Sequence, residues 1–525
     1  MKPLYILYLT LLYFLSRIPF LRFYPVFYDS FEYVQIANRL NFTNFSQVVS
    51  SSHQPIHTFY FLAILFLKNI LGFLNPEAIM VLLSLISGYL TIIVWFTLVR
   101  RYYSAKKAFF SSLLLMIMPY FFVLNTNILY ESPLLLLQVA ACFFLTLAME
   151  KKSKIYIAIS ALFWGLSISV FIGSLFLFPI FLLLLIILSK QEKFIFLTIL
   201  VSVSLAVVLG LDLLLLKSPV YIGEKFISHY LDFISLKGGI KLFGLRFLRN
   251  VIMQFSAILS LSGLVIVSIS FLFMVLKNRS RFYFYAVLVF PAVALTQYWH
   301  AGLFGRLAIY IIFPSVLLIT EVFPKKWHRI LIVFLILLTM FNYARHQQNH
   351  PALYSYYSLL DKYRVDSNIA IITSDYNRFL YEKNRENLFI IKDADDNSYR
   401  TEQYIDGSLK KNKTVLIDSA GLHFPYYQYD GDFYHVLSLG KTGESKASGW
   451  LAKYDLSLFA EDEKNSDVYF MKISRSFTKH KITPVVTYPP GKGNISLYKT
   501  YSWDPLAKII YLIFGYNDPV TWKYQ

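Results

Sequence analysis

The stretch IHTFYFLAILFLKNILGFL at residues 56–74 decides the topology of this chain. Eleven other stretches are apolar enough to cross a bilayer, and hydropathy alone does not say whether this one crosses too. If residues 56–74 do not cross and Lys2 is cytoplasmic, five basic clusters fall inside; if they cross, all five fall outside. Because cytoplasmic loops are enriched in Lys and Arg, we predict that residues 56–74 form a helix lying in the outer interface. The clusters are at 100–107, 150–154, 189–193, 277–281 and 325–329.

The composition indicates an integral membrane protein. Of the 525 residues, 56% are hydrophobic, 18% aromatic and only 15% charged, whereas soluble domains carry about 25% charged residues. The net charge is +19, and most Lys and Arg residues lie in short clusters between apolar stretches. Such clusters set the orientation of the helices in the membrane, so we expect no nucleic-acid partner. Cys142 is the single cysteine, which excludes an intrachain disulfide. The N-terminal stretch lacks a small-residue cleavage site and is predicted to be a retained transmembrane helix.

The chain is predicted to form two domains, residues 1–345 and residues 346–525. The first is expected to be a polytopic α-helical membrane domain of about 11 transmembrane helices plus external juxtamembrane helices. The helices are predicted at 3–21, 78–98, 108–125, 131–149, 155–170, 172–189, 194–216, 251–276, 282–298, 307–323 and 329–345.

The C-terminal residues change character. Short apolar stretches, namely NIAIITSDY, NLFIIKD, KTVLIDSAG and NISLYKTY, alternate with charged and Gly/Pro/Asn-rich segments. Such a pattern is typical of short strands with intervening helices, so we expect a small extracytoplasmic α/β domain. The topology predicts a multi-pass protein of the plasma membrane or an equivalent membrane, with a cytoplasmic N-terminus and an external C-terminal domain.

Three acidic residues are predicted to lie at the external face. Asp29 and Glu32 stand three residues apart in FYDSFEYVQIANRL (27–40), and Glu131 follows NTNILY. Asp-x-x-Glu is also typical of a helix start, where Asp29 would cap the first turn and Glu32 would reach back. Likewise, an acid such as Glu131 suits a helix N-terminus. Carboxylates beside hydrocarbon are nevertheless costly, which makes all three candidates for a functional role. Asp212, near the end of the seventh predicted helix, is interpreted as pairing with a neighbouring helix.

Cations are predicted beside these acids, against the positive-inside bias. Arg306 in WHAGLFGRLAIY begins a late helix from the external side, and residues 217–250 carry six Lys and Arg residues among aromatic and aliphatic ones. Two interpretations stay open: anchoring in lipid head groups, or binding the phosphate of an anionic lipid substrate. SSHQPIHTFY adds His53 and His57, which could equally be interfacial polar residues. External carboxylates and cations at the bilayer surface suggest acid–base chemistry on a lipid-linked phosphate.

Several segments resemble motifs of the GT-C superfamily of membrane glycosyltransferases, which includes protein O-mannosyltransferases (glycosyltransferase family 39), lipid A aminoarabinose transferases and oligosaccharyltransferases. YDSFEYVQIANRL resembles the first-loop acidic motif, HQPIHTFYFLAILFLKNILGF the His-Pro-Pro-Leu segment, and NTNILYESPLLLLQVAACFFL the second-loop acid with its helix. WGLSISVFIGSLFLFP resembles the following hairpin, and FGRLAIYIIFPSVLLI the late Arg-Tyr-x-x-x-Pro helix. The resemblance covers roughly residues 1–345. Two departures stand out: Ser30 delays the second acid to Glu32, and Val170 and Phe171 stand where the family often has a lysine.

The resemblance implies an inverting transfer of a sugar from a polyprenyl-phosphate-linked donor to a glycan, lipid or protein acceptor on the non-cytoplasmic face. Asp29 would be the general base, and Glu131 and Glu32 would orient the acceptor or hold a divalent cation. Superfamily members differ in their need for a metal, so the cofactor stays open. The residues implied in binding the donor phosphate are Arg306, Lys225, His229, His300 and His53.

Two other functions stay open. A transporter or flippase of lipid-linked sugars would carry polar residues at mid-membrane and broken, repeated helices, whereas most predicted helices here are uninterrupted apolar stretches. A surface-glycan ligase or polymerase would depend on the external basic residues, and Asp29 would then be dispensable.

Overall fold

The computed structural model divides the chain into two units, Met1–Pro25 with Tyr33–Asn342, and Val26–Glu32 with Tyr343–Gln525. The domain limits that the sequence suggests stay a prediction. The structure describes residues 3–23, 28–50, 57–185, 190–216, 251–277 with gaps, 283–289, 292–293, 309–323, 330–337 with gaps, 355–362 with gaps, 368–374, 387–391, 398–422, 427–429, 436–438, 447–463 except 452, and 465–475.

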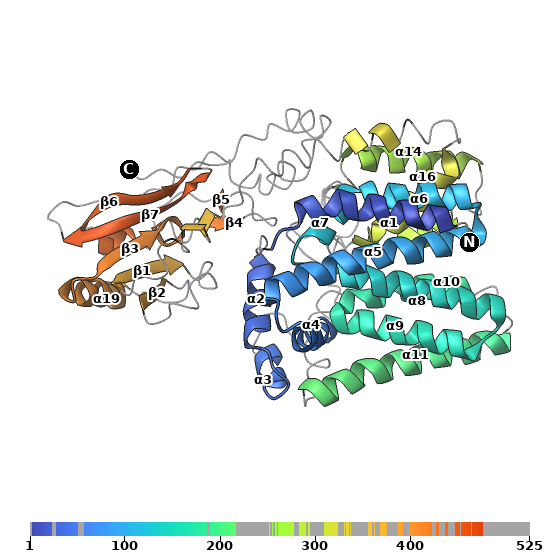
Figure 1. The fold of residues 1–525 in the computed structure, drawn as a ribbon, viewed down its shortest axis with the longest axis horizontal. Coiled ribbons are helices and arrows are strands. Elements are labelled where there is room, and N and C mark those ends of the chain that lie inside the picture. Colours follow the sequence, from blue (N-terminus) through green and yellow to red (C-terminus); the bar gives the residue numbers. More distant parts are fainter. Residues whose placement is uncertain are drawn as a thin grey trace, which may run out of the picture. The chain divides into compact units, whose positions relative to one another are not determined.

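Long apolar helices build the first unit. The helices α5 (Pro76–Tyr102), α8 (Glu131–Lys151), α9 (Lys154–Val170) and α11 (Lys190–Leu211) run side by side (Figure 1). Within the described residues, three helices are long and apolar enough to cross a membrane, and a bent pair would make a fourth span. The chain is therefore an integral membrane protein, while the number of eleven spans stays a prediction.

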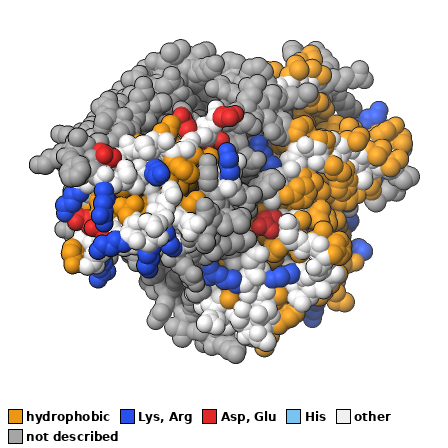
Figure 2. All heavy atoms as spheres, turned by 60° about the vertical axis from the view of Figure 1, so that its left-hand side comes forward, with side chains coloured by type: hydrophobic (Ala, Val, Ile, Leu, Met, Phe, Trp, Pro, Cys, Tyr) orange, Lys and Arg blue, Asp and Glu red, His pale blue; other side chains and the backbone are white. Residues whose placement is uncertain are grey.

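The surface of these helices is apolar. Figure 2 shows hydrophobic side chains spread over a broad face of the helical unit. Leu15, Leu214 and Leu276 are 71%, 80% and 79% exposed. In water such a surface would be unfavourable, so its natural surroundings are lipid chains. The remaining described helices of this unit are α1 (Pro3–Arg17), α6 (Ala105–Ile117), α7 (Pro119–Thr126), α10 (Phe178–Leu185), α14 (Leu261–Lys277) and α16 (Ile312–Val322).

Two of the predicted helices are interrupted. The helix predicted at 108–125 ends at Ile117, and α7 continues at an angle of 70°. Pro119 begins α7, and a proline has no N–H to donate and clashes with the preceding turn. The Arg17 guanidinium donates to the carbonyl of Met116 in the last turn of α6. The helix predicted at 172–189 begins instead as a 3-10 helix, η2 (Ile172–Leu177), after the extended residue Phe171.

Three short helices gather at one end of the bundle: α2 (Tyr28–Arg39), α3 (Phe45–Ser50) and α4 (Thr58–Ile70) (Figure 1). The 13 residues of α4 make a helix about 20 Å long, too short for a hydrocarbon core of about 30 Å. That residues 56–74 lie in the outer interface stays a prediction. Buried residues from Tyr33 in α2, Phe45 in α3 and Phe61 in α4 share one hydrophobic cluster with residues at the start of α8.

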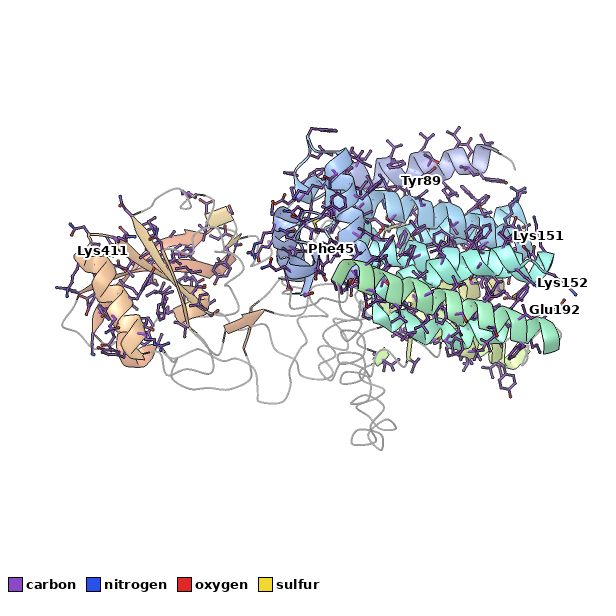
Figure 3. The ribbon with its side chains drawn as sticks, turned by 90° about the horizontal axis from the view of Figure 1, so that it is seen from below. Phe45, Tyr89, Lys151, Lys152, Glu192 and Lys411 are labelled. Carbon is purple, nitrogen blue, oxygen red and sulfur yellow. The ribbon has the colours of Figure 1, made fainter. Side chains whose placement is uncertain are left out.

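Charged pairs occupy the opposite end of the helices. Glu131 begins α8 and Lys151 ends it, a separation of about 30 Å along the helix. At the far end, Lys152 forms an ion pair of 2.9 Å with Glu192, and Arg101 on α5 pairs with Glu150. Figure 3 shows Lys151, Lys152 and Glu192 together, with Phe45 at the other end. Three of the predicted basic clusters thus lie at one end of the unit.

The second unit contains a five-stranded mixed sheet. Its strand order is β2 (Leu388–Ile391), β1 (Ile369–Ser374), β3 (Thr414–Asp418), β7 (Asn465–Arg475) and β6 (Tyr454–Asp462). β1 is parallel to β2 and β3, and β7 is antiparallel to β3 and β6. Every residue of β1 is buried, as expected for a strand covered on both faces. The smaller elements are α19 (Ser398–Lys410), α20 (Ser419–Leu422), α21 (Ser448–Leu451) and the pair β4 (Tyr427–Tyr429) with β5 (Val436–Ser438).

Three stretches predicted as strands form β1, β2 and β3. The fourth, NISLYKTY, lies outside the described residues. The core of this unit includes Ile372 of β1, Val415 of β3 and Trp450 of α21. The apolar residues of β1, β2 and β3 thus share one hydrophobic core.

Candidate active site

Helix α2 carries the first two predicted acids. It begins at Tyr28, so Asp29 is the second helical residue rather than the residue before the helix, where a cap would stand. This differs from the capping arrangement considered for Asp29. Glu32, one turn on, is 5% exposed. Tyr33 follows directly, and its ring is fully buried.

An aromatic cluster surrounds Tyr33. Its ring makes edge-on contacts with His57, Tyr60 and Tyr130, at centroid distances of 5.5, 5.8 and 6.0 Å. The His57 and Tyr130 rings are tilted by 32°, with their centroids 4.1 Å apart, and the Phe171 ring lies 6.2 Å from that of Tyr130. Aromatic pairs at such distances stabilise packing beyond their buried area. We call Tyr33, His57, Tyr60, Tyr130 and Phe171 the aromatic cluster. It joins α2, α4, α8 and the end of α9.

His57 is held in one orientation. Its Nδ1 lies 2.5 Å from the Val170 carbonyl oxygen, which can only accept, so Nδ1 carries the proton and donates. Nε2 is then the acceptor and lies 3.4 Å from the Tyr33 hydroxyl. Burial lowers the pKa of His57 to about 4, although the Val170 carbonyl opposes this shift. His57 is therefore neutral near pH 7, and it fastens the start of α4 to the end of α9.

Glu131 directly adjoins the aromatic cluster. It begins α8, directly after Tyr130, and is 1% exposed. The next residue, Ser132, donates to Asn125 Oδ1 and to the Ser84 carbonyl, both at 2.7 Å. These bonds fix the start of α8 against α5 and α7, and with it the position of Glu131.

The hydroxyl of Tyr60 lies in the same cluster. Tyr60 is 1% exposed, and among the described residues its hydroxyl has no hydrogen-bond partner. Burial, followed by the nearby Glu131, raises the pKa of Tyr60 well above its ordinary value of 10. The phenol therefore keeps its proton and can act as a hydrogen-bond donor.

Asp212 approaches the start of α4 from another helix. It begins the π-helical turn η3 (Asp212–Leu216) that extends α11, and π turns inside helices are frequent at functional sites. The Thr58 hydroxyl donates to Asp212 Oδ1 over a long 3.5 Å. This contact agrees with the interpretation that Asp212 pairs with a neighbouring helix.

The residues expected to bind the donor phosphate lie outside the described residues: Arg306, Lys225, His229, His300 and His53. Their roles stay predictions. In the described part of the chain, no three His, Cys, Asp or Glu side chains gather as metal ligands would. Cation binding by Glu131 and Glu32 likewise stays a prediction.

Sequence reasoning missed most of the aromatic cluster. His57 was noted only as an interfacial polar residue, and Tyr33, Tyr60 and Tyr130 were not singled out. Two signals pointed to it: Tyr130 precedes Glu131 directly, and Tyr33 stands four residues after Asp29, one turn along the helix. Phe171 occupies the place where the resemblance suggests a lysine, and its ring packs against Tyr130.

Comparison with known proteins gives one family match. Residues 53–213 match the dolichyl-phosphate-mannose-protein mannosyltransferase family. The matched segment includes His57, Tyr60, Glu131 and Asp212. No curated protein sequence matches the chain significantly.

Two solved structures are similar to this chain. ArnT from Cupriavidus metallidurans, bound to undecaprenyl phosphate, is similar with a TM-score of 0.53 at 12% identity, covering 89% of this chain and 97% of ArnT. The apo oligosaccharyltransferase from Archaeoglobus fulgidus gives a TM-score of 0.46 at 14% identity, covering 95% of this chain and 77% of that protein. The likeness to ArnT extends over nearly its whole length and shows a shared fold. Residues 53–213 thus match a mannosyltransferase family, and the chain as a whole shares its fold with ArnT, a membrane protein solved with undecaprenyl phosphate.

Proposed function

We propose that this protein transfers a sugar from a polyprenyl-phosphate-linked donor to an acceptor at the non-cytoplasmic face, with inversion at the anomeric carbon. Asp29 is the general base. The observation that carries this proposal is the arrangement around α8: Tyr33, one turn after Asp29, packs in the aromatic cluster beside Tyr130, and Glu131 follows at the start of the helix. The two acidic motifs of the sequence thus belong to neighbouring elements.

The location of this cluster supports the proposed sidedness. Glu131 and Lys151 stand at opposite ends of α8, and Arg101 and Lys152 lie near Lys151. Since basic residues favour the cytoplasmic side, the end with Lys151 is cytoplasmic in our proposal. The aromatic cluster then faces the other side of the membrane, together with α2 and α4.

The reaction is a direct displacement. The acceptor oxygen attacks the anomeric carbon, the bond from that carbon to the phosphate oxygen breaks, and the acceptor proton passes to the carboxylate of Asp29. Asp29 has to be ionised to accept this proton. Glu131 and the protonated Tyr60 hydroxyl orient the acceptor through hydrogen bonds. Asp29 near the start of α2 also benefits from the helix dipole, which favours the ionised carboxylate.

The leaving group is an anionic lipid phosphate. Its negative charge has to be stabilised as the bond breaks, and Arg306 is the proposed partner because a guanidinium matches phosphate oxygens in geometry and charge. Lys225, His229, His300 and His53 are proposed helpers. A polyprenyl-phosphate donor is favoured because the similar ArnT was solved with undecaprenyl phosphate.

The proposal is tested by transfer assays on purified protein. Wild type, Asp29→Asn and the matched control Glu77→Gln are prepared in detergent and given radiolabelled polyprenyl-phosphate sugars with a membrane extract of the host. Glu77 lies in the first turn of α5, so its substitution neutralises a comparable helix-start acid elsewhere. Loss of a general base is expected to reduce transfer at least 100-fold, with donor binding retained and the control active.

Two other results would contradict the proposed function. Normal transfer by Asp29→Asn would show that this residue is not the base. Donor binding without transfer by any of the three proteins would favour a transporter or flippase.

A further inference from the structure

The C-terminal end of α2 has an unusual set of hydrogen-bond partners. The last carbonyls of a helix have no acceptor role within the helix and need donors from elsewhere. Here the Lys68 ammonium donates to the carbonyls of Ala37 and Asn38 in the last turn, and to that of Leu40 just beyond the helix, at 2.9, 3.3 and 3.1 Å. The Asn44 amide donates to the Arg39 carbonyl at 2.8 Å. Four consecutive carbonyls are thus satisfied by side chains that come later in the chain.

A lysine suits this position for two reasons. Its ammonium has three N–H donors and no acceptor, which matches three carbonyls that converge on one point. Its positive charge also interacts favourably with the negative end of the α2 dipole. Lys68 belongs to the last turn of α4, so its side chain connects the end of α2 to the end of α4. Asn44 is held in turn by Asn41, whose Oδ1 accepts from the backbone N–H of Asn44 at 2.9 Å.

Two kinds of contact hold helix α2. Its buried residues, which include Tyr33, Ile36 and Leu40, pack in one hydrophobic cluster, and its carbonyl end accepts hydrogen bonds from Lys68. Apolar packing is not directional, so it tolerates a small tilt of the helix, whereas the hydrogen bonds from Lys68 set the direction of the axis. Asp29 stands at the opposite end of α2 from these carbonyls, so a tilt would displace it.

We propose that Lys68 is a positioning residue for the transfer reaction, and that it acts by fixing the direction of α2 and so the place of Asp29. This inference rests on the proposed role of Asp29 as general base. Lys68 touches neither donor nor acceptor. Its loss therefore lowers kcat through a misplaced base and leaves the KM for the lipid-linked donor nearly unchanged.

The test compares four full-length proteins in detergent: wild type, Lys68→Met, Lys68→Arg and the control Lys411→Met. Methionine keeps an unbranched apolar stem and removes the charge and the donors. Lys411 is an exposed lysine directly after α19 (Figure 3), so its substitution removes the same charge from another element of the chain. Two quantities are measured: kcat and KM for sugar transfer, and hydrogen–deuterium exchange of the amides of α2 and α8.

Lys68→Met is expected to lower kcat at least tenfold with a KM change below twofold, and to speed exchange in α2 but not in α8. Lys68→Arg keeps the cation and should recover part of kcat, while Lys411→Met should match wild type. An unchanged kcat with faster α2 exchange would reduce Lys68 to a purely structural role and overturn the proposal. Unchanged exchange in α2 would overturn the fastening itself.

A failure of the proposed base and a failure of the proposed role of Lys68 give different results. If Asp29→Asn is fully active, the proposed base is wrong, whereas the exchange result for α2 still reports on the contact made by Lys68. If Lys68→Met does not fold, Asn44→Ala takes its place. That substitution removes the donor of a single carbonyl, and a two- to fivefold fall in kcat with faster α2 exchange is then the expected result. An unchanged kcat in Asn44→Ala would count against the proposal.

Discussion

The buried neutral His57 makes a quantitative prediction about stability and pH. Its pKa in the folded protein is about 4, against 6.5 for an ordinary histidine. Between these values the unfolded chain binds a proton that the folded protein does not. Protons therefore favour the unfolded chain, and the free energy of unfolding falls as the pH drops from about 6.5 towards 4. Below pH 4 both states are protonated, and this contribution falls no further.

The size of the effect follows from the same two values. The two pKa values differ by about 2.5, and a difference of one in pKa corresponds to about 1.4 kcal/mol. The free energy of unfolding can therefore fall by at most roughly 3.5 kcal/mol through this residue. At pH 5 His57 is almost fully protonated in the unfolded chain, but only about one-tenth of the folded molecules carry this proton. The free energy of unfolding is then about 2 kcal/mol lower than at pH 7.

The assay is denaturant unfolding of the detergent-solubilised protein at several pH values between 7 and 4, for wild type and His57→Asn. Asparagine keeps an N–H donor near the Val170 carbonyl but cannot be protonated. All other titrating groups are common to both proteins, so they cancel in the difference between their free energies of unfolding. That difference should shrink by about 2 kcal/mol between pH 7 and pH 5. If it is the same at both pH values, His57 is not the buried neutral group described here.

Two further pairs of substitutions test packing and hydrogen bonding. A methyl group at Gly88 would overlap the side chain of Asn125. In the same detergent unfolding assay, Gly88→Ala should therefore destabilise the helical unit by about 1–3 kcal/mol. At Gly210 no atom lies within 4 Å of an added methyl group, so Gly210→Ala should be neutral or stabilising. In the second unit, the buried Asp418 accepts a 2.5 Å hydrogen bond from Thr373 and another from a backbone N–H. Asp418→Ala should speed hydrogen exchange in β1 and β3 by an amount equivalent to about 2–4 kcal/mol, and Thr373→Val should do so by about half as much; equal exchange in all three proteins would contradict this account.

Local signals in the sequence predicted the elements that carry the acids. A helix was expected at 131–149, and α8 spans Glu131–Lys151, because a long apolar stretch with an acid at its start leaves one plausible element. The short strands of the second unit were equally visible, since each is a run of apolar, mostly β-branched residues between polar segments.

The contacts between elements were not visible in the sequence. Tyr33, His57 and Tyr60 come from segments without a shared spacing, and in a chain with 18% aromatic residues no single tyrosine stands out. Lys68 looked like an ordinary polar residue on an apolar helix, since its partners are backbone carbonyls about 30 positions earlier. The interruption at Pro119 did have a local cause, because a proline inside an apolar stretch ends or bends a helix.

The contact between Arg17 and the Met116 carbonyl has a consequence for biosynthesis. The two residues are 99 positions apart, so the first helix leaves the ribosome long before its partner is made. Arg17 is 1% exposed in the finished protein, and a lone guanidinium facing lipid is costly. Arg17 stands in the last turn of α1, from which its side chain can reach the water at the interface until α6 is made. The buried contact with Met116 therefore forms only after the first 116 residues have been synthesised.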